Sequence, residues 1–189
     1  MTRRHTFRFG QHDSTVLSVS RDHLFNDIAS TCFYVADTNT ERYLPSAGAR
    51  MVLPSGESSK SWAQLERLVG AILDAGLSRD SAVVAVGGGM VCDIASFAAS
   101  IYMRGCDLVL IPSTLLAMVD AALGGKTSVN LSGYKNIIGT FFPAREVRLD
   151  AELLFTLPQR EYLSGLHNHL EKDGFCMAHA SPREPVWEY

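Results

Sequence analysis

The chain has 189 residues, of which 47% are hydrophobic, and its formal net charge at pH 7 is -3. That apolar content suffices for the core of one domain, with or without an appendage. The small negative charge excludes an overall basic field, so we expect no nucleic-acid partner. No apolar run is long enough to cross a bilayer, and the first residues contain no apolar signal segment, which predicts a cytoplasmic location and no membrane partner.

Short apolar runs alternate with amphipathic segments along the chain. We therefore predict an α/β fold: a doubly wound, Rossmann-like, mostly parallel sheet with helices on both faces. The first 30 residues predict a pair of polar-edged strands, with Gly10 and His12 in the turn, followed by a short helix. The other predicted strands include 32–36, 50–53, 82–86, 108–111 and 147–149, and the second strand of the pair is expected at 15–19.

Three helices are predicted between these strands. The clearest runs from 61 to 75, where Ser61 and Gln64 have the spacing of a capping box. Its apolar side chains fall on one face: Trp62, Leu65, Val69, Ile72 and Leu73. A second helix begins near Met90 and is apolar on all sides, which predicts burial. A third is expected over 114–122.

Four cysteines, at positions 32, 92, 106 and 176, show no paired metal-ligand spacing. Three of them lie among apolar residues, so we expect reduced and mostly buried thiols. The sequence assigns no metal ligand to them.

A buried strand runs into three glycines, Gly87 to Gly89, and then into the second helix. Glycines allow a tight turn and let a pyrophosphate approach the backbone N–H groups at a helix start. The spacing is not GxGxxG, and close packing of strand and helix is the alternative explanation. Asp93, one turn into an otherwise apolar helix, favours the binding interpretation.

Polar residues follow two further strands. Asp37 and Asn39 come after the strand at 32–36, while Glu57 and Lys60 come after the next strand. Ligands of open α/β sheets bind at the carboxyl ends of the strands, so these residues are candidates for binding. Local capping of turns is the alternative for each motif.

The segment from Asp120 to Asn136 places Lys126 and Lys135 near the Gly124-Gly125 pair. Two lysines, a carboxylate and an amide beside glycines predict a loop that grips an anionic, hydroxyl-rich small molecule. A P-loop is excluded because its first glycine would fall at Asp120 and the preceding segment reads as a helix.

Taken in order, these segments resemble one family: ADTN, PSGESSK, GGGMVCD, YMRG, IPSTLLAMVDAALGGKTSVN, KNIIGTFF and TLPQRE. They are similar to the N-terminal, NAD-binding half of 3-dehydroquinate synthase over about residues 32–166. The resemblance implies conversion of 3-deoxy-D-arabino-heptulosonate 7-phosphate to 3-dehydroquinate and phosphate in the shikimate pathway. It also implies catalytic NAD and a divalent metal, zinc or cobalt.

The resemblance further implies which residues act. NAD would be bound by Asp37, Asn39, Glu57, Lys60, Gly88, Gly89, Asp93, Ser113, Thr114, Lys135 and Thr156. The phosphorylated seven-carbon sugar acid would meet Asp120, Lys126, Lys135 and Asn136, with Arg104 reaching its phosphate across a homodimer interface.

After residue 166 the chain departs from the family pattern, because Asn168 stands where the family has a glutamate that ligates zinc. We therefore expect an NAD-binding α/β domain over 1–160, a domain-junction remnant with a divergent tail over 161–189, and no metal ligands. The family's helical C-terminal domain is expected to be absent, and the chain to be inactive alone. The alternatives are a non-catalytic NAD-binding remnant, another sugar phosphate cyclase and a polyol dehydrogenase.

Overall fold

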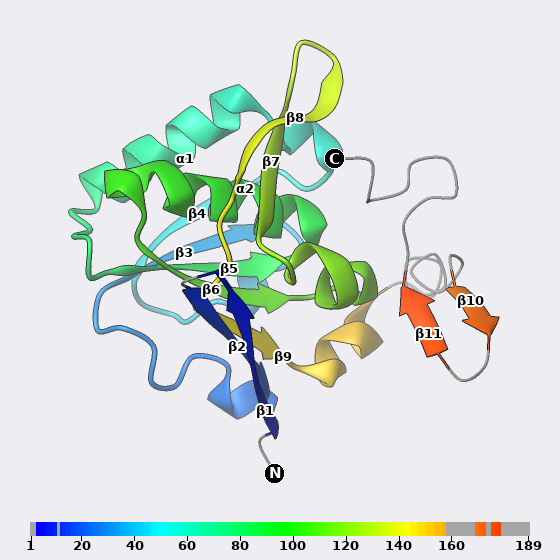
Figure 1. The fold of residues 1–189 in the computed structure, drawn as a ribbon. Coiled ribbons are helices and arrows are strands. Elements are labelled where there is room, and N and C mark those ends of the chain that lie inside the picture. The colour runs from blue at the N-terminus through cyan, green and yellow to red at the C-terminus, as the bar shows by residue number, and fades with distance from the viewer. Residues whose placement is uncertain (1–2, 11, 158–168, 173–174, 179–189) are drawn as a thin grey trace.

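The computed structural model describes residues 3–10, 12–157, 169–172 and 175–178, and its centre is a seven-stranded sheet (Figure 1). The strands are β1 (Arg3–Phe9), β2 (His12–Ser18), β3 (Cys32–Asp37), β4 (Ala49–Leu53), β5 (Ala82–Gly87), β6 (Asp107–Pro112) and β9 (Glu146–Leu149). They lie in the order β1-β2-β9-β6-β5-β3-β4. All neighbouring strands are parallel except β1 and β2. The predicted mostly parallel α/β sheet and its antiparallel opening pair are confirmed, but His12, predicted in the turn, begins β2 and pairs with Phe9.

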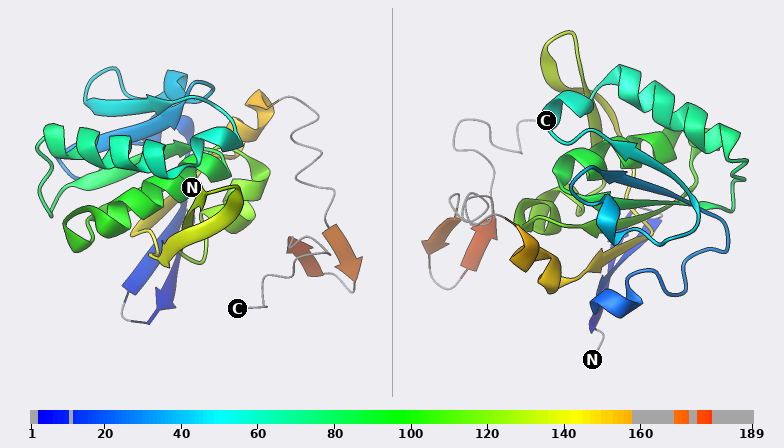
Figure 2. Two further views of the ribbon diagram at one scale, coloured as in Figure 1. Left: turned by 90° about the horizontal axis from the view of Figure 1, so that it is seen from above. Right: turned by 180° about the vertical axis from the view of Figure 1, so that it is seen from behind.

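Helical segments cover both faces of the sheet, but unequally. One face carries α1 (Trp62–Asp74), α2 (Gly89–Ile101) and a hairpin of β7 (Lys126–Leu131) and β8 (Tyr134–Phe141). Figure 2 shows the hairpin on the same side of the sheet as the two α-helices. The other face carries short 3-10 helices, among them η1 (Arg21–His23), η2 (Glu41–Tyr43) and η6 (Ala151–Thr156), with Leu24 and Leu153 fully buried against the strands.

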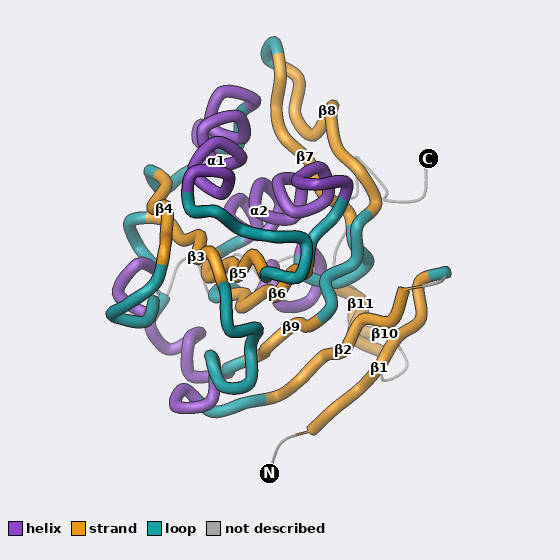
Figure 3. The backbone as a smooth tube through the Cα atoms, turned by 90° about the vertical axis from the view of Figure 1, so that its left-hand side faces the viewer, coloured by secondary structure: helices purple, strands orange, loops and turns teal. Residues whose placement is uncertain are grey.

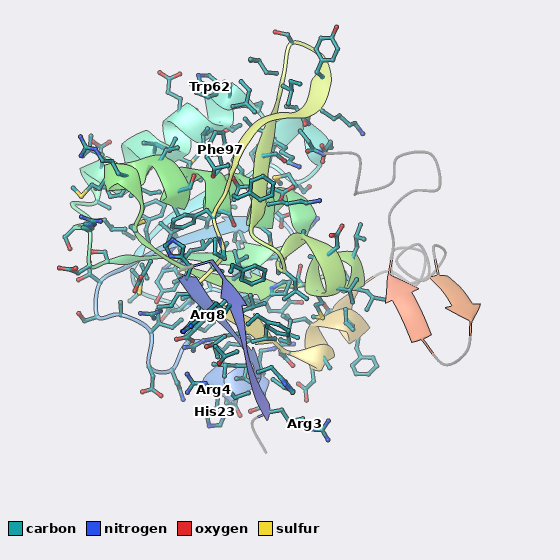
Figure 4. The ribbon with its side chains drawn as sticks, viewed as in Figure 1. Arg3, Arg4, Arg8, His23, Trp62 and Phe97 are labelled. Carbon is teal, nitrogen blue, oxygen red and sulfur yellow. The ribbon has the colours of Figure 1, made fainter. Side chains whose placement is uncertain are left out.

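The first α-helix begins as predicted, because the Ser61 hydroxyl accepts a hydrogen bond from the Gln64 N–H at 3.4 Å. Its buried stripe is narrower than predicted. Leu65, Leu68 and Ile72 are buried, whereas Trp62 is 46% exposed and Leu73 is 62% exposed. At 3.6 residues per turn, Trp62 and Leu73 lie roughly 90° or more from the centre of that stripe. Figure 4 shows Trp62 at the outer start of the helix.

The other two predicted helices also form. α2 has eight buried residues and is enclosed by the sheet, α1 and the hairpin, which confirms its predicted burial. The third becomes a π-helix, η5 (Ala117–Ala121), in which Ala122 N–H donates to the Ala117 carbonyl at 2.9 Å. Met118 of this element packs on one face of the sheet and Ala117 on the other, so the wider turn fills the edge between the two cores.

Arg3, Arg4 and Arg8 lie along the outermost strand, β1, whose residues are all exposed (Figure 4). A separate pair, β10 (His169–Lys172) and β11 (Phe175–Ala178), is antiparallel. Among the described residues, none of the helices is both long and apolar enough to cross a lipid bilayer.

The thiols of Cys92 and Cys106 are buried and that of Cys32 is half-buried, and all three are free. Burial raises the pKa of each thiol, that of Cys106 to about 11, with Asp107 adding to the shift. These cysteines are therefore protonated at neutral pH and serve as packing residues, as predicted. The side chain of Cys176 lies outside the described residues.

Candidate functional site

The carboxyl ends of four parallel strands meet along one edge of the sheet, called here the carboxyl edge. Asp37 at the end of β3 pairs with Leu53 at the end of β4, and Gly87 of β5 pairs with Pro112 of β6. Figure 3 shows these four strands side by side beneath α1 and α2. The predicted segments 37–39, 54–60, 87–89 and 113–114 are thereby brought together.

The glycine turn joins β5 to α2. A Cβ at Gly87 would lie 2.6 Å from the Val91 side chain, and a Cβ at Gly88 would lie 3.3 Å from Thr114 Cγ2. Neither glycine has a positive φ, so space rather than backbone conformation requires them. Close packing of strand and helix, the alternative explanation, therefore accounts for Gly87. Gly88 is the N-cap of α2 and provides no side-chain cap, which leaves the first N–H groups of this 13-residue helix for an anion.

A buried charge pair lies beside this turn. Lys60 is only 4% exposed, and its ammonium group forms an ion pair with Asp93 of α2. The same Nζ donates to Asn136 Oδ1 of β8 at 2.5 Å. One side chain from the β4–α1 loop thus connects a helix to the hairpin. Three predicted site residues, Lys60, Asp93 and Asn136, are thus in contact although they belong to three separate elements.

Burial raises the pKa of Asp93 to about 6, because desolvation disfavours the carboxylate. The ion pair with Lys60 lowers the pKa, while the negative charges of Glu57 and Asp120 raise it. Asp93 is therefore mostly ionised at pH 7 because Lys60 supports the charge. Asp120, one of these two negative charges, is an exposed carboxylate of η5.

Much of the segment predicted as a loop, residues 126–141, is a β-hairpin, so the predicted loop conformation was wrong. Thr127 and Val129 of β7 are buried and alternate with more exposed neighbours, which is the period of a strand. Leu131 pairs with Tyr134 across Ser132-Gly133, both with positive φ, the geometry of a two-residue hairpin turn. The Ser132-Gly133 dipeptide is the signal in the sequence that indicates this turn, and the alternation of Thr127 and Val129 with polar neighbours indicates the strand.

The hairpin carries the two predicted lysines. Lys126 begins β7, Lys135 is the second residue of β8, and both side chains are exposed. Within the described part of the chain, neither forms an ion pair, with Asp120 or any other carboxylate. They are thus available to an anionic ligand.

Several predicted cofactor residues have local partners. Asp37 Oδ1 accepts from the N–H of Asn39 and of Thr40, both at 3.0 Å, so the local-capping alternative is realised for that oxygen. Thr114 Oγ1 accepts a hydrogen bond from the N–H of Ala117, the first residue of η5, at 3.2 Å. The exposed Thr156 hydroxyl donates to the Leu153 carbonyl at 2.6 Å.

Ser113 and Gly89 also have neighbours at the carboxyl edge. Buried Ser113 donates its N–H to the Gly87 carbonyl at 2.8 Å and so holds the strand ends together. Gly89 is the first residue of α2, and a Cβ there would approach the Ala121 methyl at 3.6 Å, an ordinary contact.

Arg104 does not join the other predicted residues within this chain. It lines a cavity of about 420 Å³ near the amino ends of β2 and β6, the opposite edge of the sheet, together with His12, Asp13, Arg79, Asp80, Asp107 and Arg145. Met103 and Arg104 both have positive φ (49° and 66°), which turns the chain sharply before β6. The predicted role of Arg104 across a dimer interface stays a prediction.

No group of three or more His, Cys, Asp or Glu side chains that could hold a metal occurs among the residues whose side chains are described. Asn168 and the neighbouring histidines lie outside those residues. No metal ligand is therefore assigned to residues 3–10 and 12–157, and no chemical step is assigned to a metal.

Known proteins resemble this chain in sequence and fold. A 3-dehydroquinate synthase of Chlamydia caviae is 41% identical over 150 residues, covering 78% of this chain and 38% of that protein. A 2-deoxy-scyllo-inosose synthase complexed with carbaglucose-6-phosphate, NAD+ and Co2+ matches with a TM-score of 0.77 and 25% identity, covering 91% of this chain and 53% of that one. ValA, a 2-epi-5-epi-valiolone synthase from Streptomyces hygroscopicus with NAD+ and Zn2+ bound, matches with a TM-score of 0.72 and 29% identity over 84% of this chain and 48% of that one.

The chain thus spans well under half the length of the curated relative. The family described as 3-dehydroquinate synthase N-terminal matches residues 50–164, which include the glycine turn, the buried charge pair and the hairpin. Since this match covers more than half of the chain, the protein belongs to the 3-dehydroquinate synthase N-terminal family.

Proposed function

We propose that this chain is the NAD-binding portion of a 3-dehydroquinate synthase, with residues 1–160 forming the NAD-binding domain and 161–189 a junction segment and tail. In the complete enzyme, 3-deoxy-D-arabino-heptulosonate 7-phosphate would be converted to 3-dehydroquinate and phosphate. The observation that carries the proposal is the carboxyl edge, where an uncapped helix N-terminus lies beside the buried pair of Lys60 and Asp93.

The chemistry of this edge suits a dinucleotide. The N–H groups after Gly88 suit a pyrophosphate, because the helix end is positive and Gly88 leaves room for the backbone to be approached. Carboxylates can accept hydrogen bonds from ribose hydroxyls, and Asp37, Glu57 and Asp93 all belong to this region. We assign Asp37, Asn39, Glu57 and Lys60 to the adenosine side, Gly88, Gly89 and Asp93 to the pyrophosphate, and Ser113, Thr114 and Thr156 to further cofactor contacts.

The hairpin would meet the substrate. Lys126 and Lys135 are unpaired cations in the described chain, and Asn136 is held by Lys60 next to the cofactor region. Two lysines can balance the charge of a phosphate and of a developing enolate, while Asp120 can order hydroxyl groups. When bound, NAD supplies a reversible hydride acceptor. A homodimer in which Arg104 reaches the partner's substrate, and a cytoplasmic location, belong to the same proposal.

Calorimetric titration of the purified chain with NAD tests the cofactor assignment directly. Saturable one-site binding that is competed by ADP-ribose is the expected result. A chain that is folded by circular dichroism yet shows no heat of binding at millimolar NAD would contradict it.

The substrate assignment needs the complete enzyme architecture. Residues 1–160 grafted onto the C-terminal part of a 3-dehydroquinate synthase should release phosphate from 3-deoxy-D-arabino-heptulosonate 7-phosphate. In that chimera Lys126→Ala should lower kcat/KM, and the loss of transition-state stabilisation calculated from the ratio should be about 2–4 kcal/mol. Identification of the product separates 3-dehydroquinate synthase from another sugar phosphate cyclase, and a twofold effect or less would return Lys126 to an ordinary surface charge.

A further inference from the structure

The strand that carries Lys135 and Asn136 is bulged. Val129 pairs with Ile138 and Leu131 pairs with Tyr134, so a single residue of β7, Asn130, faces residues 135–137 of β8. Asn136 has a φ of 54°, a left-handed conformation that asparagine tolerates better than most residues. Bulges often redirect side chains beside active sites. Because Lys135 and Asn136 lie in this bulge, the contacts that hold the bulge also set the direction of their side chains.

Asn130 supplies that fixation through its side-chain amide and its backbone N–H. Its Oδ1 accepts from the Asn136 N–H at 2.8 Å, and its Nδ2 donates to Glu57 Oε1 at 2.9 Å. Its own backbone N–H donates to the Lys60 carbonyl at 2.9 Å, and Ser61 forms an isolated parallel bridge with it. One residue thus joins the bulge to the β4–α1 loop through three hydrogen bonds.

We propose that Asn130 is a positioning residue that holds the Lys135–Asn136 bulge against the β4–α1 loop and couples the two. The coupling to ligand rests on the proposed function, because Glu57 is assigned to the cofactor and Lys135 to the substrate. Asparagine suits the position because one planar amide both donates and accepts. Aspartate would keep the acceptor for Asn136 but would face Glu57 with a second carboxylate, and alanine would lose both side-chain bonds.

A consequence follows from thermodynamic linkage. If NAD fixes Glu57 and Lys60, it fixes the partner of Asn130 and thereby slows opening of the bulge. The hairpin would then be ordered by the cofactor before the substrate arrives.

Hydrogen exchange followed by mass spectrometry on the whole chain tests both statements. Without NAD, Asn130→Ala should speed exchange in peptides covering 134–141 at least fivefold, while peptides of α2 and β5 stay unchanged. Tyr134→Phe, on the same strand but outside these bonds, is the matched control. General destabilisation would speed exchange in all of these peptides together.

The second measurement repeats the exchange experiment with saturating NAD. Calorimetry gives the NAD concentration that saturates each variant. In the wild type, NAD should slow exchange of 134–141 at least threefold. Asn130→Asp should keep much of the protection of the Asn136 amide without NAD but lose the NAD-induced slowing. The double variant Glu57→Gln/Asn130→Asp should recover it, because the glutamine amide introduced at position 57 can donate to the new carboxylate.

Each result decides a separate point. Exchange of 134–141 that is the same in Asn130→Ala and the wild type overturns the positioning role. NAD-induced slowing that persists in Asn130→Asp overturns the coupling. A wild type that binds no NAD while Asn130→Ala still loosens the hairpin leaves the positioning role standing, and overturns the coupling to NAD and the proposed cofactor site.

Discussion

The two edges of the same sheet hold charge in different ways. At the carboxyl edge, Lys60 and Asp93 are largely removed from water and join three elements. At the amino edge, Arg145 bonds Asp107 at 2.6 Å with both side chains 40% exposed, around a cavity of about 420 Å³. The cavity at the amino edge lies beside solvated ion pairs, whereas the proposed NAD site at the carboxyl edge has a buried ion pair and a helix N-terminus without a side-chain cap. Strand direction, more than the size of a hollow, indicates where an open α/β sheet binds.

The sharpest test of this contrast breaks one ion pair at each edge. Lys60→Met should lower the free energy of unfolding by about 3–5 kcal/mol at pH 7.5, since a buried carboxylate is left uncompensated. The loss should be smaller at pH 5, where Asp93 is protonated. Arg145→Met should cost about 1 kcal/mol or less, as is usual for an exposed pair. Urea denaturation measures both, and equal losses would remove the distinction between the edges.

The second test concerns the glycine turn. Gly88→Val should weaken NAD binding at least 100-fold, equivalent to about 2.7 kcal/mol. The new side chain would press on Thr114 and cover the helix N–H groups. Gly70→Ala is the control and should leave the affinity unchanged. Gly70 lies on α1, and a Cβ added there would meet no atom within 4 Å. Calorimetry on both folded variants provides the comparison, and equal affinities would place the pyrophosphate elsewhere.

The pH dependence of stability gives a third, smaller effect. Asp93 has a folded-state pKa of about 6, above its ordinary value of 3.8, so the folded state binds more protons between these pH values. Stability therefore falls as pH rises from about 4 to about 7. Relative to Asp93→Asn, the wild type should lose on the order of 1–3 kcal/mol over this interval. Urea titrations at pH 4.5 and 7 measure the difference, and an opposite slope would show that Lys60 outweighs desolvation.

The smallest expected effect lies at the amino edge. Arg104→Ala should leave the NAD affinity of the chain within twofold of the wild type, because Arg104 lies at the edge opposite the glycine turn. A tenfold loss would show that the two edges communicate or that the arginine of a second copy reaches the cofactor. Repeating the titration at several protein concentrations separates these causes.

Much of the fold could be predicted because burial dominates it. The apolar runs of β5 and β6 and the all-round apolar surface of α2 have one simple explanation each. The hairpin was missed because its alternation is carried by Thr127 and Val129 among polar neighbours. Trp62 and Leu73 were predicted on the apolar face of α1, but the sequence does not show how much of that face its neighbours cover, and both side chains are exposed.

The candidate site was predictable only in part. Residues at strand ends, such as Asp37 and Gly88, follow from topology once parallel strands are assumed. The meeting of Lys60 with Asn136, and the role of Asn130, depend on how the hairpin docks on the loop. That docking joins Lys60 to a residue 76 positions further along the chain, which no local pattern encodes.

The outermost strand has a consequence for handling the protein. Among the residues that the structure describes, no strand pairs with the outer row of backbone groups of β1 at the margin of the sheet, and Phe7 and Phe9 are exposed beside that row. Such a margin invites another chain to add itself as a further strand. Arg8 is paired with Asp13 of β2, but Arg3 and Arg4 give that margin a positive charge, so two copies approaching edge to edge repel each other. Concentrated salt screens this repulsion, so fibrous aggregates should form sooner at high salt. Replacement of Arg3 and Arg4 by uncharged residues should have the same effect at low salt.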